Sequence, residues 1–98
     1  MAMLLEFSPS GFTTEKYDAS IRELEKAGQG APTGRLSHVA YGDPQSLRVT
    51  DVWETKEEFE AFGVTLMPIL RGVGIDPGEP KVTQLHNVVI GLPAAVVS

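Results

Sequence analysis

Two ionisable side chains in neighbouring β-rich segments could form a proton-handling pair. Asp51 lies within the strand-like run LRVTDVWE (47–54), two residues before Trp53, which is the only tryptophan of the chain. His38 lies in the preceding run RLSHVAY (35–41). A carboxylate inside a strand is costly to bury unless it is paired or hydrogen-bonded. An imidazole beside it could be oriented by it or could hold a proton, so His38 and Asp51 are the candidate catalytic residues.

The pair depends on the register between the two runs. They are separated by the five residues GDPQS (42–46), whose Gly, Asp and Pro are typical of a hairpin connection. One register sets three pairs opposite one another: Ala40 with Val49, His38 with Asp51, and Leu36 with Trp53. A slip of one residue separates the His38–Asp51 pair. The alternative is a structural role, either as a polar pair that only stabilises the fold or with Asp51 bonding the backbone and Arg48 near a sheet edge.

Aromatic side chains after Asp51 could line a ligand pocket between helices and sheet. Trp53 stands just before a helix cap, and Phe59 and Phe62 share one face of the helix that follows. The commoner role of such a tryptophan is to fill the core between helix and sheet, and the two roles are compatible. His86, in the last β-rich run, is the fourth candidate pocket residue, and its alternative is a hydrogen-bonded histidine or one at a subunit seam.

Strand-like and helix-like segments alternate along the chain. Strands are expected over 3–7, 35–41, 47–54 and 81–90, and helices after a Thr13 or Thr14 cap and from Lys56 after the Thr55 cap. Pro68 is expected to kink the last turn of the second helix or to start a short separate one. The order β-α-β-β-α-β predicts an α+β, ferredoxin-like single domain over 1–98. It has a four-stranded antiparallel sheet with two helices on one face, and 91–98 forms a tail or an edge strand.

The last strand-like run, KVTQLHNVVI (81–90), carries apolar residues on both of its sides. Val82, Val88 and Ile90 alternate with Leu85 and Val89, so both faces of such a strand should be covered. The two helices cover one face only. We therefore expect a homodimer in which two sheets pack face to face.

Composition excludes several classes of function. The net charge is -5 and no basic stripe is present, which argues against nucleic-acid binding. Cysteine is absent and the two histidines lack metal-binding spacing, so no metal site is expected. No flavin, nicotinamide or phosphate-loop motif is found, so no cofactor is expected. No run approaches the ~20 apolar residues of a membrane span, and no signal peptide is recognised, so we expect a cytoplasmic protein with no membrane partner.

Four segments resemble the dimeric α/β-barrel superfamily, the antibiotic-biosynthesis-monooxygenase-like proteins: GRLSHVAYG (34–42), RVTDVWETKEEFEAF (48–62), LMPILRGVGI (66–75) and QLHNVV (84–89). The likeness is strongest to small bacterial members without an assigned activity. It implies two ferredoxin-like subunits whose sheets pack into a barrel. Characterised members include cofactor-independent monooxygenases, haem-degrading enzymes, lactone isomerases and proteins that only bind a ligand. The Asn–Trp–His set of the haem-degrading members has no match here, because Trp53 ends a strand.

The sequence therefore favours a small dimeric protein that binds a small hydrophobic ligand between its helices and sheet. The alternative is a cofactor-independent monooxygenase or isomerase that acts on a small hydrophobic or aromatic compound. The sequence leaves open whether the protein is an enzyme.

Overall fold

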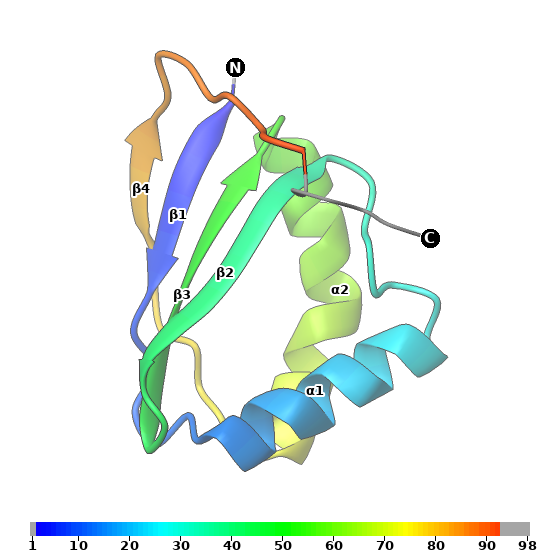
Figure 1. Ribbon diagram of the computed structural model, residues 1–98. Helices are drawn as coiled ribbons and strands as arrows, with labels where there is room; N and C mark the ends of the chain where they lie inside the picture. The colour runs from blue at the N-terminus through cyan, green and yellow to red at the C-terminus, as the bar shows by residue number, and fades with distance from the viewer. Residues whose placement is uncertain (1, 93–98) are drawn as a thin grey trace.

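The computed structural model describes residues 2–92 and has the predicted ferredoxin-like order of elements. These are β1 (Met3–Phe7), α1 (Thr14–Lys26), β2 (Arg35–Asp43), β3 (Ser46–Trp53), α2 (Lys56–Gly72) and β4 (Lys81–Gln84). The strands form one antiparallel sheet in the order β2-β3-β1-β4. Both helices lie on the same face of this sheet, and the other face carries no helix (Figure 1). The predicted α+β architecture is confirmed.

Both helices begin at threonine caps that the sequence indicated. The Thr13 hydroxyl accepts a hydrogen bond from the Lys16 amide at 3.2 Å. The Thr55 hydroxyl accepts one from the Glu58 amide at 3.1 Å, so α2 begins at Lys56 as predicted. Each cap satisfies an amide that has no partner within its helix.

Pro68 does not divide α2, which continues as one helix to Gly72. The expectation of a short separate helix is therefore wrong. Proline removes the hydrogen bond to the carbonyl four residues earlier, that of Val64. The Val64 side chain is 78% exposed, so this turn faces solvent and water can satisfy the freed carbonyl.

The β2–β3 hairpin has the predicted register over most of its length. His38 lies opposite Asp51. The connection is shorter than the five residues expected, because Asp43 already pairs with Ser46. The predicted pairing of Leu36 with Trp53 is wrong. A β-bulge between residues 35 and 37 adds one residue to β2, so Arg35 lies opposite Trp53 instead.

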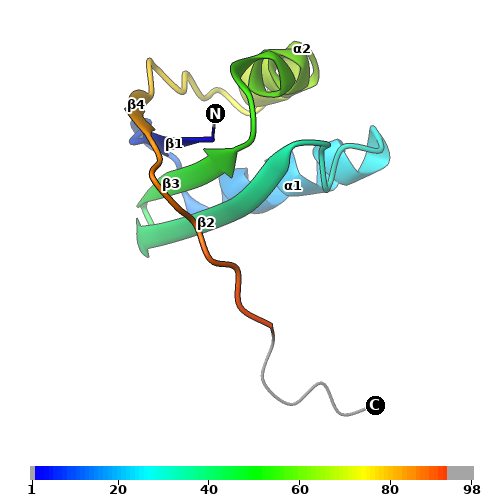
Figure 2. The same ribbon diagram turned by 90° about the horizontal axis from the view of Figure 1, so that it is seen from above.

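The last strand is shorter than the predicted range 81–90. β4 ends at Gln84, which pairs with Met3, and one further backbone bond joins the Leu85 amide to the Ala2 carbonyl at 3.0 Å. β4 therefore ends opposite Met3, the first residue of β1. Residues 85–92 lie outside the sheet, and this segment leads across the end of the sheet at which β3 ends and β2 begins (Figures 1 and 2).

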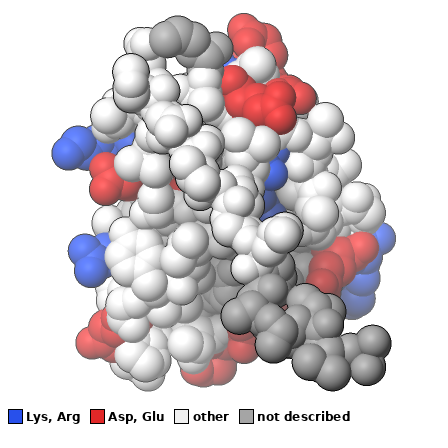
Figure 3. Space-filling view, turned by 45° about the horizontal axis from the view of Figure 1, so that its top comes forward, with Lys and Arg blue, Asp and Glu red and all other residues white. Residues whose placement is uncertain are grey.

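The apolar side chains of this C-terminal segment are therefore on the surface. Val89 is 84% exposed, Ile90 59% and Leu92 94%. The predicted tail or edge strand over 91–98 falls mostly outside the described residues, and residues 91 and 92 belong to no helix or strand. Uncharged atoms cover most of the centre of the view in Figure 3, while most acidic and basic side chains lie toward its margins.

Two groups of buried side chains fill the space between the helices and the sheet. One group consists of Phe12, Leu47, Val49, Leu70 and Ile75. The other consists of Leu5, Leu24, Trp53 and Phe62. Trp53 is 0% exposed and Leu5 1%, so the tryptophan has the core position given as its alternative.

The Thr55 cap provides a test of how strongly local sequence fixes α2. Thr55→Ala should lower the free energy of unfolding by about 1 kcal/mol, because the Glu58 amide loses its acceptor. Thr55→Ser, which keeps the hydroxyl, should stay within about 0.5 kcal/mol of wild type. Urea unfolding followed by circular dichroism measures both values. Equal losses in the two variants would show that the cap is not the source of the stabilisation.

Candidate functional site

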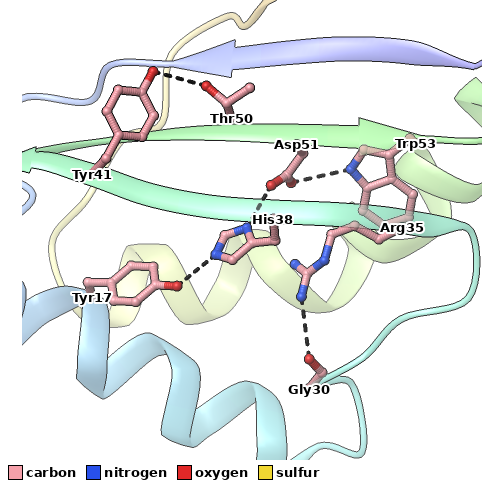
Figure 4. Close-up of polar contacts among 8 residues, drawn as sticks. All are labelled: Tyr17, Gly30, Arg35, His38, Tyr41, Thr50, Asp51 and Trp53. Atoms are coloured by element: carbon pink, nitrogen blue, oxygen red, sulfur yellow. Dashed lines mark hydrogen bonds and ion pairs between the residues drawn. The ribbon is translucent and has the colours of Figure 1, made fainter. Parts of the chain in front are cut away.

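A chain of hydrogen bonds connects α1 with the two strands of the hairpin (Figure 4). The Tyr17 hydroxyl of α1 lies 2.7 Å from Nε2 of His38 on β2. Nδ1 of the same imidazole lies 2.6 Å from Oδ1 of Asp51 on β3. The indole N–H of Trp53 donates to the other carboxylate oxygen of Asp51 at 3.3 Å. The predicted His38–Asp51 pairing thus extends into a four-residue network.

The network fixes where its protons lie. A carboxylate only accepts hydrogen bonds, so we assign a proton to Nδ1 of His38. In the neutral imidazole Nε2 must then accept, and the Tyr17 hydroxyl donates to it. When His38 is protonated, Nε2–H donates to the Tyr17 oxygen, and the hydroxyl proton is free to turn elsewhere. The charge state of His38 therefore decides whether Tyr17 offers a lone pair or a proton to a third group.

Burial of Asp51 is compensated by its two donors. The residue is 5% exposed, and no buried side-chain nitrogen or oxygen in the described part of the chain lacks a partner. His38 and Trp53 supply the hydrogen bonds that an isolated buried carboxylate would lack. The alternative in which Asp51 bonds Arg48 is not the arrangement found, because the Arg48 guanidinium lies over the Tyr41 ring at 5.0 Å.

The Tyr17 hydroxyl of this network is less acidic in the folded protein than a free tyrosine side chain. Burial raises its pKa above the ordinary tyrosine value. The nearby Arg35 charge opposes this rise in pKa, and the negative charges of Asp51 and Asp18 add to it. Tyr17 therefore enters any chemistry at neutral pH as an intact hydroxyl.

A cavity of about 70 Å³ lies beside this network, between the helices and the sheet. Its wall is mostly apolar and draws on α1, α2, three strands and the loops that join them. The polar side chains among its lining are Tyr17, Ser20, Arg35, His38 and Asp51. An apolar cavity of about 150 Å³ is enough for benzene. A single aromatic ring therefore fits here only if lining side chains move outward.

The structure brings together four of the six residues that the sequence singled out. His38, Asp51, Phe59 and Phe62 all line the cavity. Trp53 does not line it, because its indole packs between Phe59 and Phe62, with ring centroids 5.6 and 5.4 Å away. His86 does not line it either, because β4 ends before it and leaves it exposed.

Three polar lining residues, Tyr17, Ser20 and Arg35, were missed by the sequence reasoning. Tyr17 belongs to the apolar face of α1, and the need of a buried tyrosine hydroxyl for a partner was a usable signal. Arg35 reaches the cavity because the β-bulge turns it to the helix side of the sheet, opposite Trp53. No sequence signal marked that bulge.

Neither metal nor membrane features are found in the described part of the chain. Residues 2–92 contain no cluster of three or more His, Asp or Glu side chains placed to hold a metal ion. Within the same range, no helix has both the length and the apolar character needed to cross a bilayer.

Comparison with known proteins adds evidence on the fold. No protein-family model matches the chain, and no curated protein matches it. Solved structures do match. The structural-genomics protein YJCS superposes with a TM-score of 0.63 at 9% identity, over 88% of this chain and 100% of that one.

Two further matches are provisionally assigned as antibiotic biosynthesis monooxygenases. The protein from Chloroflexus aurantiacus J-10-fl has a TM-score of 0.56 at 22% identity, over 92% of this chain and 97% of that one. The protein from Deinococcus radiodurans has a TM-score of 0.52 at 12% identity, over 95% and 99%. The resemblance to the antibiotic-biosynthesis-monooxygenase-like superfamily is confirmed at the level of the fold.

The proton positions in the network can be tested with Asp51→Asn. Trp53 can only donate, so the single amide oxygen of the new side chain should face the indole. Its NH₂ group then faces Nδ1 of His38, which must accept, and the imidazole proton moves to Nε2. Nitrogen-15 NMR of the neutral imidazole distinguishes the two tautomers. Asp43→Asn, at the exposed end of the hairpin, should leave the wild-type tautomer unchanged. A wild-type tautomer in folded Asp51→Asn protein would contradict the assigned network.

The raised pKa of Tyr17 predicts a change in stability at alkaline pH. Tyr17→Phe should lower the free energy of unfolding at neutral pH by about 1 kcal/mol, because a hydrogen bond to His38 is lost. The folded state favours the protonated hydroxyl, so this contribution is complete below the unfolded pKa of about 10. It is lost as pH rises through the higher folded value. Urea unfolding should therefore show a smaller difference between wild type and variant at about pH 10.5 than at pH 7. A constant or larger difference would contradict the assigned shift.

Proposed function

We propose that this protein binds a small hydrophobic ligand in the cavity between the helices and the sheet. The observation that carries the proposal is the lining of that cavity. Apolar side chains from both helices and from the sheet line it, and a few polar groups converge on it from α1, β2 and β3. This combination is typical of small-molecule sites. The size of the cavity favours a ligand no larger than a single ring.

A second candidate is an enzyme, and the Tyr17–His38–Asp51 chain favours it. A bound substrate could give an acidic proton to the Tyr17 oxygen while the Tyr17 proton passes to Nε2 of His38. The resulting imidazolium would be stabilised by the carboxylate of Asp51 at 2.6 Å from Nδ1. This proton transfer suits an isomerase, or a cofactor-independent monooxygenase acting on a small hydrophobic or aromatic compound. The provisional assignments of the two structural matches agree with the latter.

Ligand binding can be tested with a neutral probe, benzyl alcohol. Titration followed by amide NMR should give saturable shifts at residues that line the cavity. Ile21→Phe enlarges a lining side chain of α1 and should weaken binding by about 10-fold or more, a loss of about 1.4 kcal/mol. The matched control is Val64→Phe, which adds the same ring on the exposed outer side of α2 and should bind as wild type does. Shifts that do not saturate, or that are equal in all three proteins, would contradict the proposal.

We also propose that two copies pack through the sheet face that carries no helix. The register places Leu4, Val39, Tyr41 and Val52 on this face. Val39 is 50% exposed and Tyr41 36%, which leaves apolar surface uncovered by this chain. The family resemblance implies the same sheet-on-sheet contact, which would be isologous about a two-fold axis.

Sedimentation equilibrium at micromolar concentration should therefore give twice the chain mass. Val39→Asp places a charge in the proposed interface and should shift the protein to monomer. Val64→Asp introduces the same charge on the outer side of α2 and should remain dimeric. A wild-type monomer at all concentrations would contradict the proposed dimer.

A further inference from the structure

We infer that the ligand carries an anionic oxygen and that Arg35 is the residue that selects it. The inference deepens the proposed function and rests on it, because it assumes that the cavity holds a small hydrophobic molecule. It is carried by the position of Arg35 at a mostly apolar cavity, by its unused hydrogen-bond donors, and by the charges around it.

Arg35 reaches the cavity because of the β-bulge. In the bulge-free register Leu36 would lie opposite Trp53, and its side chain would point to the helix side. The extra residue brings Arg35 to that position and turns Leu36 toward solvent, where it is 37% exposed. Bulges are common beside functional sites because they redirect a side chain in this way. Here a cation replaces an aliphatic side chain at the edge of the core.

The guanidinium has unused hydrogen-bonding capacity. Arginine carries five N–H donors, and Arg35 uses one for the Gly30 carbonyl at 3.3 Å. Its carbon lies 5.4 Å from the centre of the Phe62 ring, which also lines the cavity. Within the described residues, Arg35 forms no ion pair with a carboxylate. The remaining donors can bind an anionic oxygen group in the planar, bidentate geometry that arginine favours.

The other charges at the cavity favour an anion over a cation. The Asp51 carboxylate is engaged by His38 and Trp53, and its exposed side-chain fraction is only 7%. His38 is either neutral or positive, and in its positive state it frees the Tyr17 hydroxyl to donate to the ligand. Tyr17 lines the same cavity as Arg35 and offers a second polar group to a ligand bound there.

Two chemical sources can supply such an oxygen. One is a carboxylate on a small apolar body, and the other is the ionised hydroxyl of a phenol or enol. Both place a negative oxygen beside an apolar group, which matches one polar end in a mostly apolar cavity. Benzoate and its neutral isostere benzamide test the first source. The phenolate of 4-nitrophenol, compared with its neutral form at lower pH, tests the second.

A purely structural role for Arg35 is the competing explanation. The bond to the Gly30 carbonyl ties β2 to the preceding loop, so loss of the side chain could loosen that loop. Arg35→Gln removes the charge, and a loosened loop would weaken charged and neutral ligands alike, so a comparison of the two ligands separates the two roles. Arg48→Gln is the matched control, since Arg48 lies on the opposite face of the sheet over Tyr41.

The experiment is a set of NMR titrations of wild type and both variants with benzoate and benzamide. Wild type should bind benzoate at least about 10-fold more tightly than benzamide, because a charge-assisted bond is made only with the anion. Arg35→Gln should remove this preference and leave benzamide affinity within about 2-fold of wild type. Arg48→Gln should keep the preference. Titrations with 4-nitrophenol at pH values above and below its pKa show whether the phenolate is bound, and whether its binding depends on Arg35 in the same way.

The possible results are distinguishable. If benzamide and benzoate bind equally well and Arg35→Gln changes neither, the inference fails while the proposed hydrophobic site stands. If neither compound nor benzyl alcohol binds, the proposed function fails and the inference fails with it. If Arg35→Gln lowers the affinity for both compounds equally, the guanidinium acts by holding the loop in place, and the inference is again overturned.

Discussion

The buried carboxylate of Asp51 is the constraint on which the centre of this structure depends. An ionised group at 5% exposure is tolerable only with good donors, and His38 and Trp53 supply them. A one-residue slip of the hairpin would remove His38, whereas Trp53 lies two residues further along the same strand as Asp51. The hairpin register and the inward direction of the imidazole are therefore linked. Tyr17 then extends the same constraint to α1, since its hydroxyl is the partner of the second imidazole nitrogen.

Most of the fold could be predicted because local signals and hydrophobic patterns agree. Threonine caps fixed the starts of both helices, and turn residues indicated the hairpin. The length of β4 could not be predicted in the same way. Its own sequence continues to alternate through Ile90, but a strand ends where its partner ends, and β1 begins at Met3. The limit on β4 is thus set by residues about 80 positions earlier in the chain.

Contacts of the candidate site that depend on neighbouring segments could be predicted from the sequence, and contacts that depend on how distant elements pack could not. The His38–Asp51 contact follows from the register of one hairpin, which short-range pattern and turn chemistry define. The Tyr17 contact depends on how α1 packs across the sheet, and the Arg35 position depends on a bulge. Neither the packing of α1 nor the β-bulge can be read from the hydrophobic pattern of a single segment. The place of Trp53 before the helix cap allowed either a pocket wall or a core position, and its complete burial, away from the cavity lining, agrees with the core position.

The cavity itself argues for more than a structural role. Apolar side chains line a hollow of about 70 Å³ that is partly open to solvent, so they keep surface that tighter packing would remove from water. Small domains have total stabilities of only about 5–15 kcal/mol, so incomplete burial of this kind is a real loss of stability. A larger aliphatic residue at Ser20, which is buried and lines the cavity, would reduce it. A fold selected for stability alone would be expected to fill this space, whereas a fold that must admit a ligand would keep it open beside its polar network.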